Sequence, residues 1–262
     1  MSRGSGRDVG RRPGRAQPMA EVAVGGRRSA LEAVRAGAAR RLLLADGSRD
    51  TQGLRELRTA AAEAGIAIEA VPRARLDALG LRNHQGVAAL VRSRAITELD
   101  ERALAVYPFE ADAVVVVLDG VTDPQNLGAS ARVAEAAGAS MLVTRHHRAA
   151  PSSASAVRAS AGALLHLPVA RVANVTRAVE RLKGRGFLVV GLDQGARTGI
   201  HEGPPPARPV ALVAGSEGVG LSRLVREACD ELVAIPLPGR TGSLNEAAAL
   251  AVGLFGYVLR PR

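Results

Sequence analysis

The hydrophobic and polar positions of this chain alternate in a regular way after residue 112. Short runs of consecutive apolar residues are separated by longer stretches whose apolar residues recur every three or four positions. The first pattern is typical of a buried β-strand, and the second of an amphipathic α-helix. The predicted strands are 113–119, 140–144, 166–172, 187–193, 209–215 and 231–237, and the predicted helices are 126–138, 152–165, 174–186, 221–229 and a final helix from 246. Continuous apolar strands that alternate with helices predict a parallel sheet covered on both faces.

The preceding part of the chain shows the same alternation on a smaller scale. Leu31, Val34 and Ala38 recur at helical spacing, and a second helical pattern follows. The predicted helices here are 25–37 and 51–64, and the predicted strands are 41–46, 66–71 and 86–92. A compact second α/β unit therefore precedes the larger one.

These patterns divide the chain into four parts. Residues 21–94 form a small predicted α/β domain, residues 95–111 a linker, and residues 112–262 the larger α/β domain. The first 18 residues hold five Arg and one Asp and show no apolar periodicity. We therefore expect residues 1–20 to be a disordered basic arm, which either contacts RNA phosphates or is an inert leader.

The net charge and the aromatic content of the chain indicate which class of molecule it binds. The formal net charge is +10, which favours a polyanionic partner such as nucleic acid. The chain has no Trp, two Tyr and three Phe, so recognition by stacking bases on aromatic side chains is disfavoured. If this protein binds RNA, arginine and backbone groups must make most of the contacts.

Other features of the sequence bear on compartment and metal binding. No apolar run reaches the roughly 18 residues that span a bilayer, and no apolar segment follows the basic N-terminus as in a signal peptide. The single cysteine, Cys229, cannot form an internal disulfide, which favours a reducing cytoplasm and no membrane association. No metal site is predicted, because the histidines lack metal-ligand spacing; they are His84, His146, His147, His166 and His201.

Three loops that follow predicted strands carry unusual polar residues, at the strand ends where parallel α/β sheets bind ligands. The first begins with Asp123 and Asn126 after a buried strand and places Arg132 inside an Ala-rich helix. A capped turn with a solvated arginine explains most of this segment. The small residues from Gly128 to Ala131 indicate in addition that something approaches the helix closely.

The second loop, LVAGSEGVGLS at 212–222, sets three glycines around Glu217. It lacks the Gly-Lys-Ser/Thr ending of a P-loop and the spacing of a dinucleotide fingerprint. It is either an ordinary strand-to-helix turn with Ser222 as a cap, or a loop whose glycines admit a flat ligand while Glu217 holds a ribose or an arginine.

The third loop, IPLPGRTGSLNEAA at 235–248, leads into the final helix. Ser243 and Glu246 match the capping box S-x-x-E, with Ser243 as N-cap and Glu246 at the third helical position. We therefore expect replacement of Glu246 by Val to cost roughly 0.5–2 kcal/mol of stability and to leave ligand binding nearly intact. Capping does not explain Asn245 or the richness of the loop in Gly and Pro.

In this order, the three loops resemble the three signature motifs of the SpoU (TrmH) family of RNA 2′-O-ribose methyltransferases, in the SPOUT class. The motifs are DPQNLGASAR, GSEGVG and IPLPGRTGSLN. VGGRRSALEAVRAG and HQGVAALV resemble the L30e-like substrate-binding domain of the family, so the resemblance covers roughly residues 21–259. LDGVTDPQNLGA and CDELVAIPL are most similar to enzymes that methylate a guanosine of 23S rRNA. One departure is Glu246, since the family usually has small or apolar residues after Asn245.

The resemblance implies an α/β fold in which a SPOUT domain with a parallel sheet and a deep trefoil knot follows a small L30e-like domain. It implies a homodimer with its active site near the subunit interface, S-adenosylmethionine as cofactor and no metal. The implied partner is RNA, as 23S rRNA or a large-subunit assembly intermediate. By position, the cofactor pocket is lined by Gly215, Ile235 and Leu244.

The resemblance also implies roles for five polar residues. Arg132 holds the target phosphate and serves as base, Asn126 positions Arg132 or the ribose, Glu217 orients Arg132 or the substrate, and Ser243 and Asn245 organise the closing loop.

Two alternatives stay open. The same chemistry could act on a tRNA guanosine or an rRNA adenosine. Alternatively, the chain is a non-catalytic RNA-binding or ribosome-assembly protein of the same fold, which the basic charge and the altered third motif favour. A Rossmann methyltransferase is disfavoured by the absence of an early Gly-rich strand-turn.

Overall fold

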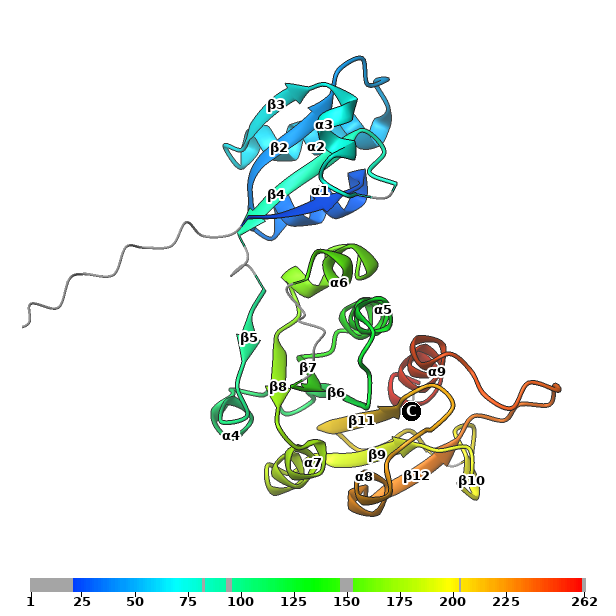
Figure 1. Ribbon diagram of the computed structural model, residues 1–262. Helices are drawn as coiled ribbons and strands as arrows, with labels where there is room; N and C mark the ends of the chain where they lie inside the picture. Colours follow the sequence, from blue (N-terminus) through cyan, green and yellow to red (C-terminus); the bar gives the residue numbers. More distant parts are fainter. Residues whose placement is uncertain (1–20, 82, 93–95, 147–152, 203, 261–262) are drawn as a thin grey trace, which may run out of the picture.

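The computed structural model describes residues 21–81, 83–92, 96–146, 153–202 and 204–260. Two separate β-sheets organise them, a small one near the N-terminus and a large one that takes up the rest (Figure 1). The predicted basic arm, along with His147, lies outside the described residues. No helix in the described ranges is long and apolar enough to cross a membrane.

The small sheet has four strands in the order β1-β4-β2-β3. Its strands are β1 (Glu21–Gly25), β2 (Ala39–Ala45), β3 (Ala67–Val71) and β4 (Val87–Arg92), and its helices are α1 (Arg27–Arg35), α2 (Gln52–Glu63) and α3 (Arg73–Asp77). Strand β4 is antiparallel to both of its neighbours, while β2 and β3 are parallel. The sequence pattern predicts three of these strands and misses β1, an edge strand whose apolar run has only the three residues Val22–Val24.

The large sheet has eight strands in the order β10-β12-β9-β11-β6-β7-β8-β5, and every neighbouring pair is parallel. Its longer strands are β6 (Val114–Asp119), β7 (Met141–Arg145), β8 (Val169–Val172), β9 (Leu188–Leu192), β11 (Val210–Gly215) and β12 (Glu231–Ala234). These are the six predicted strands, and the predicted parallel sheet is confirmed. Two short strands, β5 (Glu98–Leu99) and β10 (Thr198–Gly199), extend the edges. Thus part of the predicted linker joins the large sheet.

Helices cover both faces of the large sheet, as the continuous apolar strands had predicted. Because side chains alternate along a strand, Val114 and Val116 of β6 pack on one face with α5 and α9, and Val115 and Val117 pack on the other with α7 and α8. The helices of the large unit are α4 (Ala103–Val106), α5 (Pro124–Ala136), α6 (Ala154–Ala159), α7 (Val175–Gly184), α8 (Arg223–Ala228) and α9 (Glu246–Gly253), which continues into the π-helical turn η3 (Leu254–Val258). The trefoil knot stays a prediction.

The predicted helix 152–165 is interrupted where the two units meet. Ala161 and Gly162 have positive φ angles of 51° and 94°, and they separate α6 from the 3₁₀ turn η2 (Ala163–Leu165). A side chain at position 162 would lie 2.7 Å from Cβ of Glu32 on α1, and His166 Nε2 lies 3.4 Å from Glu32 Oε2. The small unit therefore rests on α6 and η2, on the side of the large sheet that carries α5 and α9 (Figure 1).

Candidate functional site

A cavity of about 320 Å³ lies at the carboxyl ends of β12, β9 and β11, three neighbouring strands of the large sheet. Gly215, Ile235 and Leu244, the three residues expected in a cofactor pocket, all line it. So do Glu217 and Ser243. The rest of the lining comprises Leu192–Gly195, other residues of 214–221, Arg226, Gly242, Glu246 and Ala249.

The glycine-rich loop after β11 folds back on itself at the edge of this cavity. The Gly220 backbone N–H donates to the Ser216 carbonyl oxygen at 2.8 Å, and Gly218 and Gly220 have positive φ angles of 80° and 72°. A Cβ atom on Gly215 would collide with the backbone of Gly220 and Leu221. Glycine at 215 is thus required by the chain's own backbone, and Glu217 stays exposed on the cavity side of the loop.

A buried carboxylate connects the first loop to the second. Asp119, the last residue of β6, is 8% exposed, and its Oδ2 accepts the backbone N–H of Ser222 at 2.7 Å. Ser222 is the N-cap residue of α8, although its own side chain makes no capping hydrogen bond. The sequence places Asp119 where the buried strand passes into the first polar loop, but it indicated no role for this residue.

An ion pair that sequence reasoning also missed lines the cavity. Asp193 Oδ2 lies 3.1 Å from Arg226 Nε, and Asp193 Oδ1 accepts the Gly195 backbone N–H at 2.7 Å. The pair joins the end of β9 to α8, so it depends on the strand order and has no local pattern in the sequence.

The first motif lies on α5, beside the cavity. Asp123 caps this helix: its Oδ2 accepts the backbone N–H groups of Gln125 and Asn126 at 3.1 and 3.0 Å. A Cβ on Gly128 would lie 2.5 Å from the Ala156 carbonyl oxygen and from the Ala159 Cβ of α6. The close approach predicted from the small residues is therefore made by a neighbouring helix of the same chain.

The two implied catalytic residues of α5 do not line the cavity. Asn126 is half-buried and Arg132 is exposed. Arg132 makes no hydrogen bond or ion pair with any residue that the structure describes. Within one copy of the chain, Arg132 therefore does not share the cavity with the lining residues Glu217 and Ser243.

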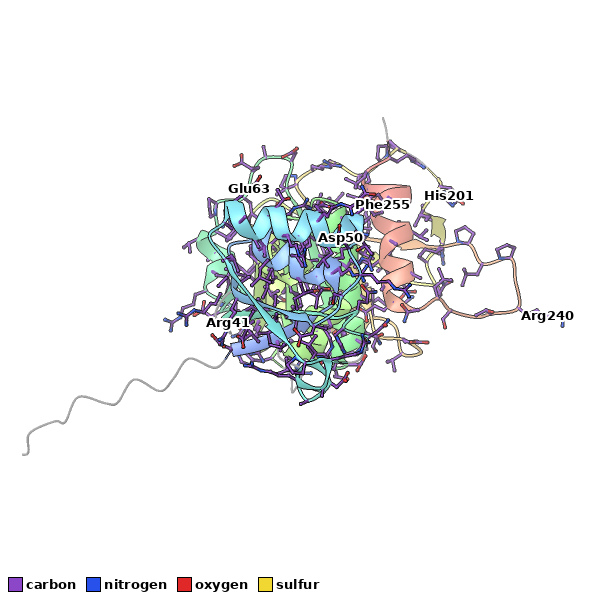
Figure 2. The ribbon with its side chains drawn as sticks, turned by 90° about the horizontal axis from the view of Figure 1, so that it is seen from above. Arg41, Asp50, Glu63, His201, Arg240 and Phe255 are labelled. Carbon is purple, nitrogen blue, oxygen red and sulfur yellow. The ribbon has the colours of Figure 1, made fainter. Side chains whose placement is uncertain are left out.

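The third motif begins its helix differently from the expectation. Asn245 is the N-cap of α9, and its Oδ1 accepts the Ala247 backbone N–H at 3.0 Å. Ser243 is exposed in the preceding loop, which projects from the body with Arg240 at its tip (Figure 2). Glu246 is the first residue of α9 and accepts the Ser130 hydroxyl at 3.2 Å. The predicted capping box is wrong, because α9 packs on α5 and turns this carboxyl toward it.

Glu246 is a buried acid in the cavity wall. It is 3% exposed, and Ser130 is completely buried. Burial raises the pKa of Glu246 from 4.5 to about 7; the hydrogen bond from Ser130 opposes this rise, and the nearby charge of Glu217 adds to it. Both protonation states of Glu246 are therefore populated near neutral pH.

The two quoted motifs of the small unit adjoin each other. A Cβ on Gly25 would lie 3.2 Å from the His84 Cβ, and the Gly26 N–H donates to the Val87 carbonyl at 3.1 Å. His84 is buried; its Nδ1 accepts the Gly86 N–H at 3.0 Å, and its Nε2 lies 2.9 Å from Asp77. Since Nδ1 is an acceptor, the ring proton is on Nε2 and points to Asp77.

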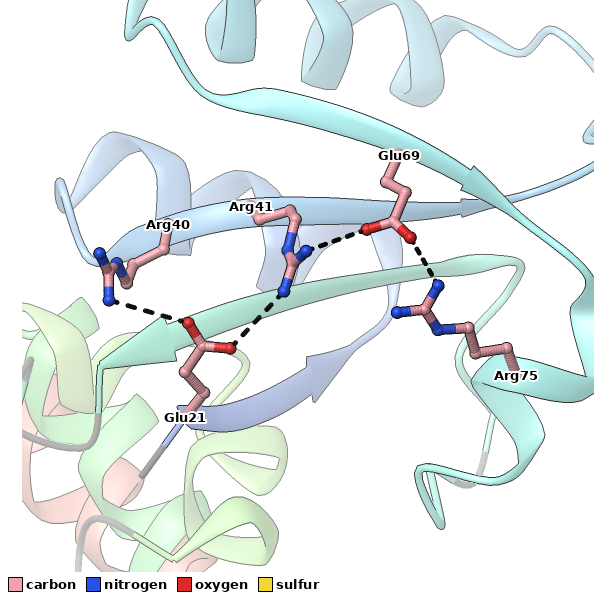
Figure 3. A network of polar contacts seen from close by, with 5 residues as sticks. All are labelled: Glu21, Arg40, Arg41, Glu69 and Arg75. Carbon is pink, nitrogen blue, oxygen red and sulfur yellow. Dashed lines mark hydrogen bonds and ion pairs between the residues drawn. The ribbon is translucent and has the colours of Figure 1, made fainter. Parts of the chain in front are cut away.

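The exposed face of the small sheet carries an alternating network of arginines and glutamates (Figure 3). Glu21 lies between Arg40 and Arg41, at 4.0 and 3.9 Å, and Glu69 lies between Arg41 and Arg75, at 3.2 and 2.5 Å. Three guanidinium groups share two carboxylates, so the network keeps one net positive charge and spare N–H donors.

Comparisons with known proteins match both units. Residues 113–255 match the sequence model of the SpoU rRNA methylase family, and residues 23–96 match the model for RNA 2′-O ribose methyltransferase substrate binding. A Mycobacterium ulcerans (strain Agy99) protein, named an uncharacterized tRNA/rRNA methyltransferase, is 41% identical over 246 residues, which is 93% of this chain and 79% of that protein.

Two solved structures are similar over almost the whole chain. A crystal structure of an RNA 2′-O ribose methyltransferase has a TM-score of 0.75 at 28% identity and covers 90% of this chain and 87% of its own. The SpoU methyltransferase AviRb from Streptomyces viridochromogenes, in complex with the cofactor AdoMet, has a TM-score of 0.70 at 28% identity, with 91% and 90% covered. The similarity therefore extends over the small and the large sheet together.

Proposed function

We propose the following function for this chain, which belongs to the SpoU rRNA methylase family: it transfers the methyl group of S-adenosylmethionine to a ribose 2′-hydroxyl of RNA, with a guanosine of 23S rRNA as the target. The observation that carries this proposal is the cavity at the carboxyl ends of β12, β9 and β11, where the second and third motifs meet. Ligands of parallel α/β sheets bind at such strand ends.

The lining of the cavity fits this cofactor. At about 320 Å³, the cavity is in the size range of small-molecule sites. The backbone at Gly215 is exposed to it without an intervening side chain, and Ile235 and Leu244 supply apolar contact. The carboxylate of Glu217 suits a ribose hydroxyl or a cationic group.

The chemistry requires alignment and removal of one proton. When bound, S-adenosylmethionine supplies an electrophilic methyl group on a sulfonium. The residues of the chain hold the 2′-hydroxyl in line with it, and the hydroxyl proton must leave as the bond forms. We assign the target phosphate to Arg132, with Asn126 and Glu217 orienting the reactants and Ser243 and Asn245 shaping the closing loop. Arginine is protonated at neutral pH, so Arg132 accepts the hydroxyl proton only after its own is displaced.

We infer that the active site is completed by a second copy of the chain. Ser130 faces α9 and the cavity wall, whereas Arg132, two residues later, is about 200° further around α5 and exposed. Arg132 therefore faces away from the cavity of its own chain. A homodimer in which α5 of one protomer meets the cavity of its partner would join Arg132 to Glu217 and Ser243.

Methylation of unmodified 23S rRNA with labelled S-adenosylmethionine tests the activity. The labelled nucleotide should resist alkaline hydrolysis, because a 2′-O-methyl group blocks attack by the ribose hydroxyl. Arg132→Ala should abolish labelling, while Arg177→Ala, which removes another exposed arginine from the large unit, should retain it. Labelling of a tRNA guanosine or an rRNA adenosine would show that this nucleotide, and not a 23S rRNA guanosine, is the substrate. Cofactor binding without methyl transfer to any RNA would favour the non-catalytic alternative.

Mixing two inactive variants tests the shared site. Arg132→Ala keeps the cavity, and Gly215→Ala keeps Arg132 but displaces the loop at the cavity edge, because its Cβ would collide with the backbone of Gly220 and Leu221. After subunit exchange, a heterodimer has one intact cavity facing one intact Arg132, so activity should return. If both elements act within one protomer, the mixture stays inactive.

A further inference from the structure

One carboxyl group in the wall of the cavity has no role in the proposed transfer. Glu246 is 3% exposed and lines the cavity, and its Oε1 accepts the Ser130 hydroxyl at 3.2 Å. Among the described residues, Oε2 has no hydrogen-bond donor. A buried carboxylate is costly unless a donor or a cation meets it, so this position favours a ligand that brings one.

The cofactor and its product differ by one charge. S-adenosylmethionine carries a positive sulfonium, and S-adenosylhomocysteine carries a neutral thioether in its place. A carboxylate that is itself 3% exposed attracts the first more strongly than the second, because Coulomb interactions strengthen as the local dielectric constant falls.

We propose that Glu246 gives this cavity its preference for the charged cofactor over the neutral product, by releasing its proton to solvent when the cofactor binds and holding a proton when the product is bound. The proposal rests on the proposed function, since it takes S-adenosylmethionine as the ligand. It gives the departure from small residues after Asn245 a role in product release.

Glu246 can change its protonation state near neutral pH when a cation binds beside it. Its pKa is raised by burial to about 7, so the protonated form is common before the ligand binds. A nearby cation lowers the pKa of a carboxyl. Each unit by which the cofactor lowers it increases affinity by about tenfold at pH values well above 7, and leaves affinity unchanged at low pH.

Among the charged groups around the cavity, Glu246 is the one whose protonation we expect to change when the cofactor binds. Glu217 adds a negative charge that favours the protonated form of Glu246, and Asp193 is already paired with Arg226. On α5, which packs against Glu246, the charged side chains are exposed, and α9 carries no second ionisable residue. The ionisable residues of the cavity lining other than Glu246, and those of α5, are Glu217, Asp193, Arg226, Arg132 and Glu135.

Calorimetric titration of the full-length protein with S-adenosylmethionine and S-adenosylhomocysteine, at about pH 6 and about pH 8, tests the proposal. The ratio of the two dissociation constants should shift toward the cofactor by about tenfold between these pH values. The sulfonium makes the α-amino group of the cofactor more acidic than that of the product, so the part of the shift that Glu246 causes is the difference between the wild type and Glu246→Gln, measured with the same two ligands. In buffers of different ionisation enthalpy, the cofactor should release a proton near neutral pH and the product should not.

Variants assign the effect to one residue. In Glu246→Gln the pH dependence of the ratio should fall to the part that the ligands themselves contribute, and the proton release from residue 246 should be lost, whereas Glu135→Gln, an exposed acid on α5, should behave as wild type. Ser130→Ala keeps the carboxyl but removes the hydrogen bond that favours its charged form, so the pH midpoint should rise. This second variant keeps the test valid if Glu246→Gln fails to fold.

The outcomes separate this proposal from the function on which it rests. If the wild-type ratio is the same at both pH values, or if Glu246→Gln keeps the full pH dependence of the wild type, the role of Glu246 is overturned while the cofactor assignment stands. If S-adenosylmethionine does not bind at either pH, the proposed function fails as well.

Discussion

Replacing Glu246 by Gln should remove a pH dependence from the folding stability of the protein. The pKa of Glu246 is 4.5 in the unfolded chain and about 7 in the native state. Between these values the native state binds more protons than the unfolded state, so rising pH destabilises the fold. The contribution is fully present below about pH 4.5 and is lost as the pH rises through about 7. A shift of this size corresponds to about 3 kcal/mol.

Glutamine keeps the shape of the protonated acid and still accepts the Ser130 hydroxyl, but it does not titrate. The variant and the wild type should therefore have similar stability at about pH 5, and the variant should be more stable by up to about 3 kcal/mol at about pH 8. Urea unfolding followed by tyrosine fluorescence measures this difference. The chain has no Trp, and its two tyrosines, Tyr107 and Tyr257, pack in the core of the large unit.

A difference in stability that stays constant from about pH 5 to about pH 8 would refute this reasoning, since it would mean that Glu246 has the same protonation state throughout. Glu217→Gln is an internal control. It removes the negative charge that raises the native pKa of Glu246, so the loss of stability should be smaller in total and should end at a lower pH. Unchanged behaviour of that variant would place the whole effect in burial.

Two glycine substitutions test the packing around the site. Gly215→Ala should abolish binding of S-adenosylmethionine in calorimetry, because its Cβ collides with the backbone of Gly220 and Leu221. Normal affinity would show that the loop can shift to accept this Cβ without loss of the binding site. Gly128→Ala should lower the free energy of unfolding by about 1–3 kcal/mol, because α5 and α6 must move apart. Gly53→Ala on α2 is the matched control: its Cβ meets nothing within 4 Å, so stability should hold or rise by up to about 1 kcal/mol. Equal effects at 53 and 128 would contradict the packing argument.

The elements that could be predicted from the sequence are those whose pattern is local. The six longer strands of the large sheet are short and mostly apolar, with β6 and β11 the most continuous and β8 interrupted by Arg171, so their pattern alone identifies them. Strands β5 and β10 have two residues each, which is too short for any period. The break between α6 and η2 lies at Ala161 and Gly162, whose φ angles are positive, and Gly162 packs closely on Glu32 of the small unit; helical periodicity does not report either feature.

The same distinction applies to the site. The resemblance to the SpoU family identified Gly215, Ile235 and Leu244 as neighbours, and the cavity brings them together. The ion pair of Asp193 with Arg226 requires the strand order of the sheet, which no local pattern contains. Asp119 reaches Ser222 for the same reason, because β6 lies directly beside β11.

Glu246 was misinterpreted because two local rules compete at the start of α9. A Ser followed three residues later by Glu normally predicts a capping box, but Asn245 caps this helix by itself. The helix start therefore does not need Glu246, and its carboxyl is buried against Ser130 at the edge of the cavity. An apolar residue there would avoid the cost of burying an acid. Protonation offsets part of this cost, since burial raises the pKa of Glu246 to about 7, and a cationic cofactor in the adjoining cavity would offset it for the charged form.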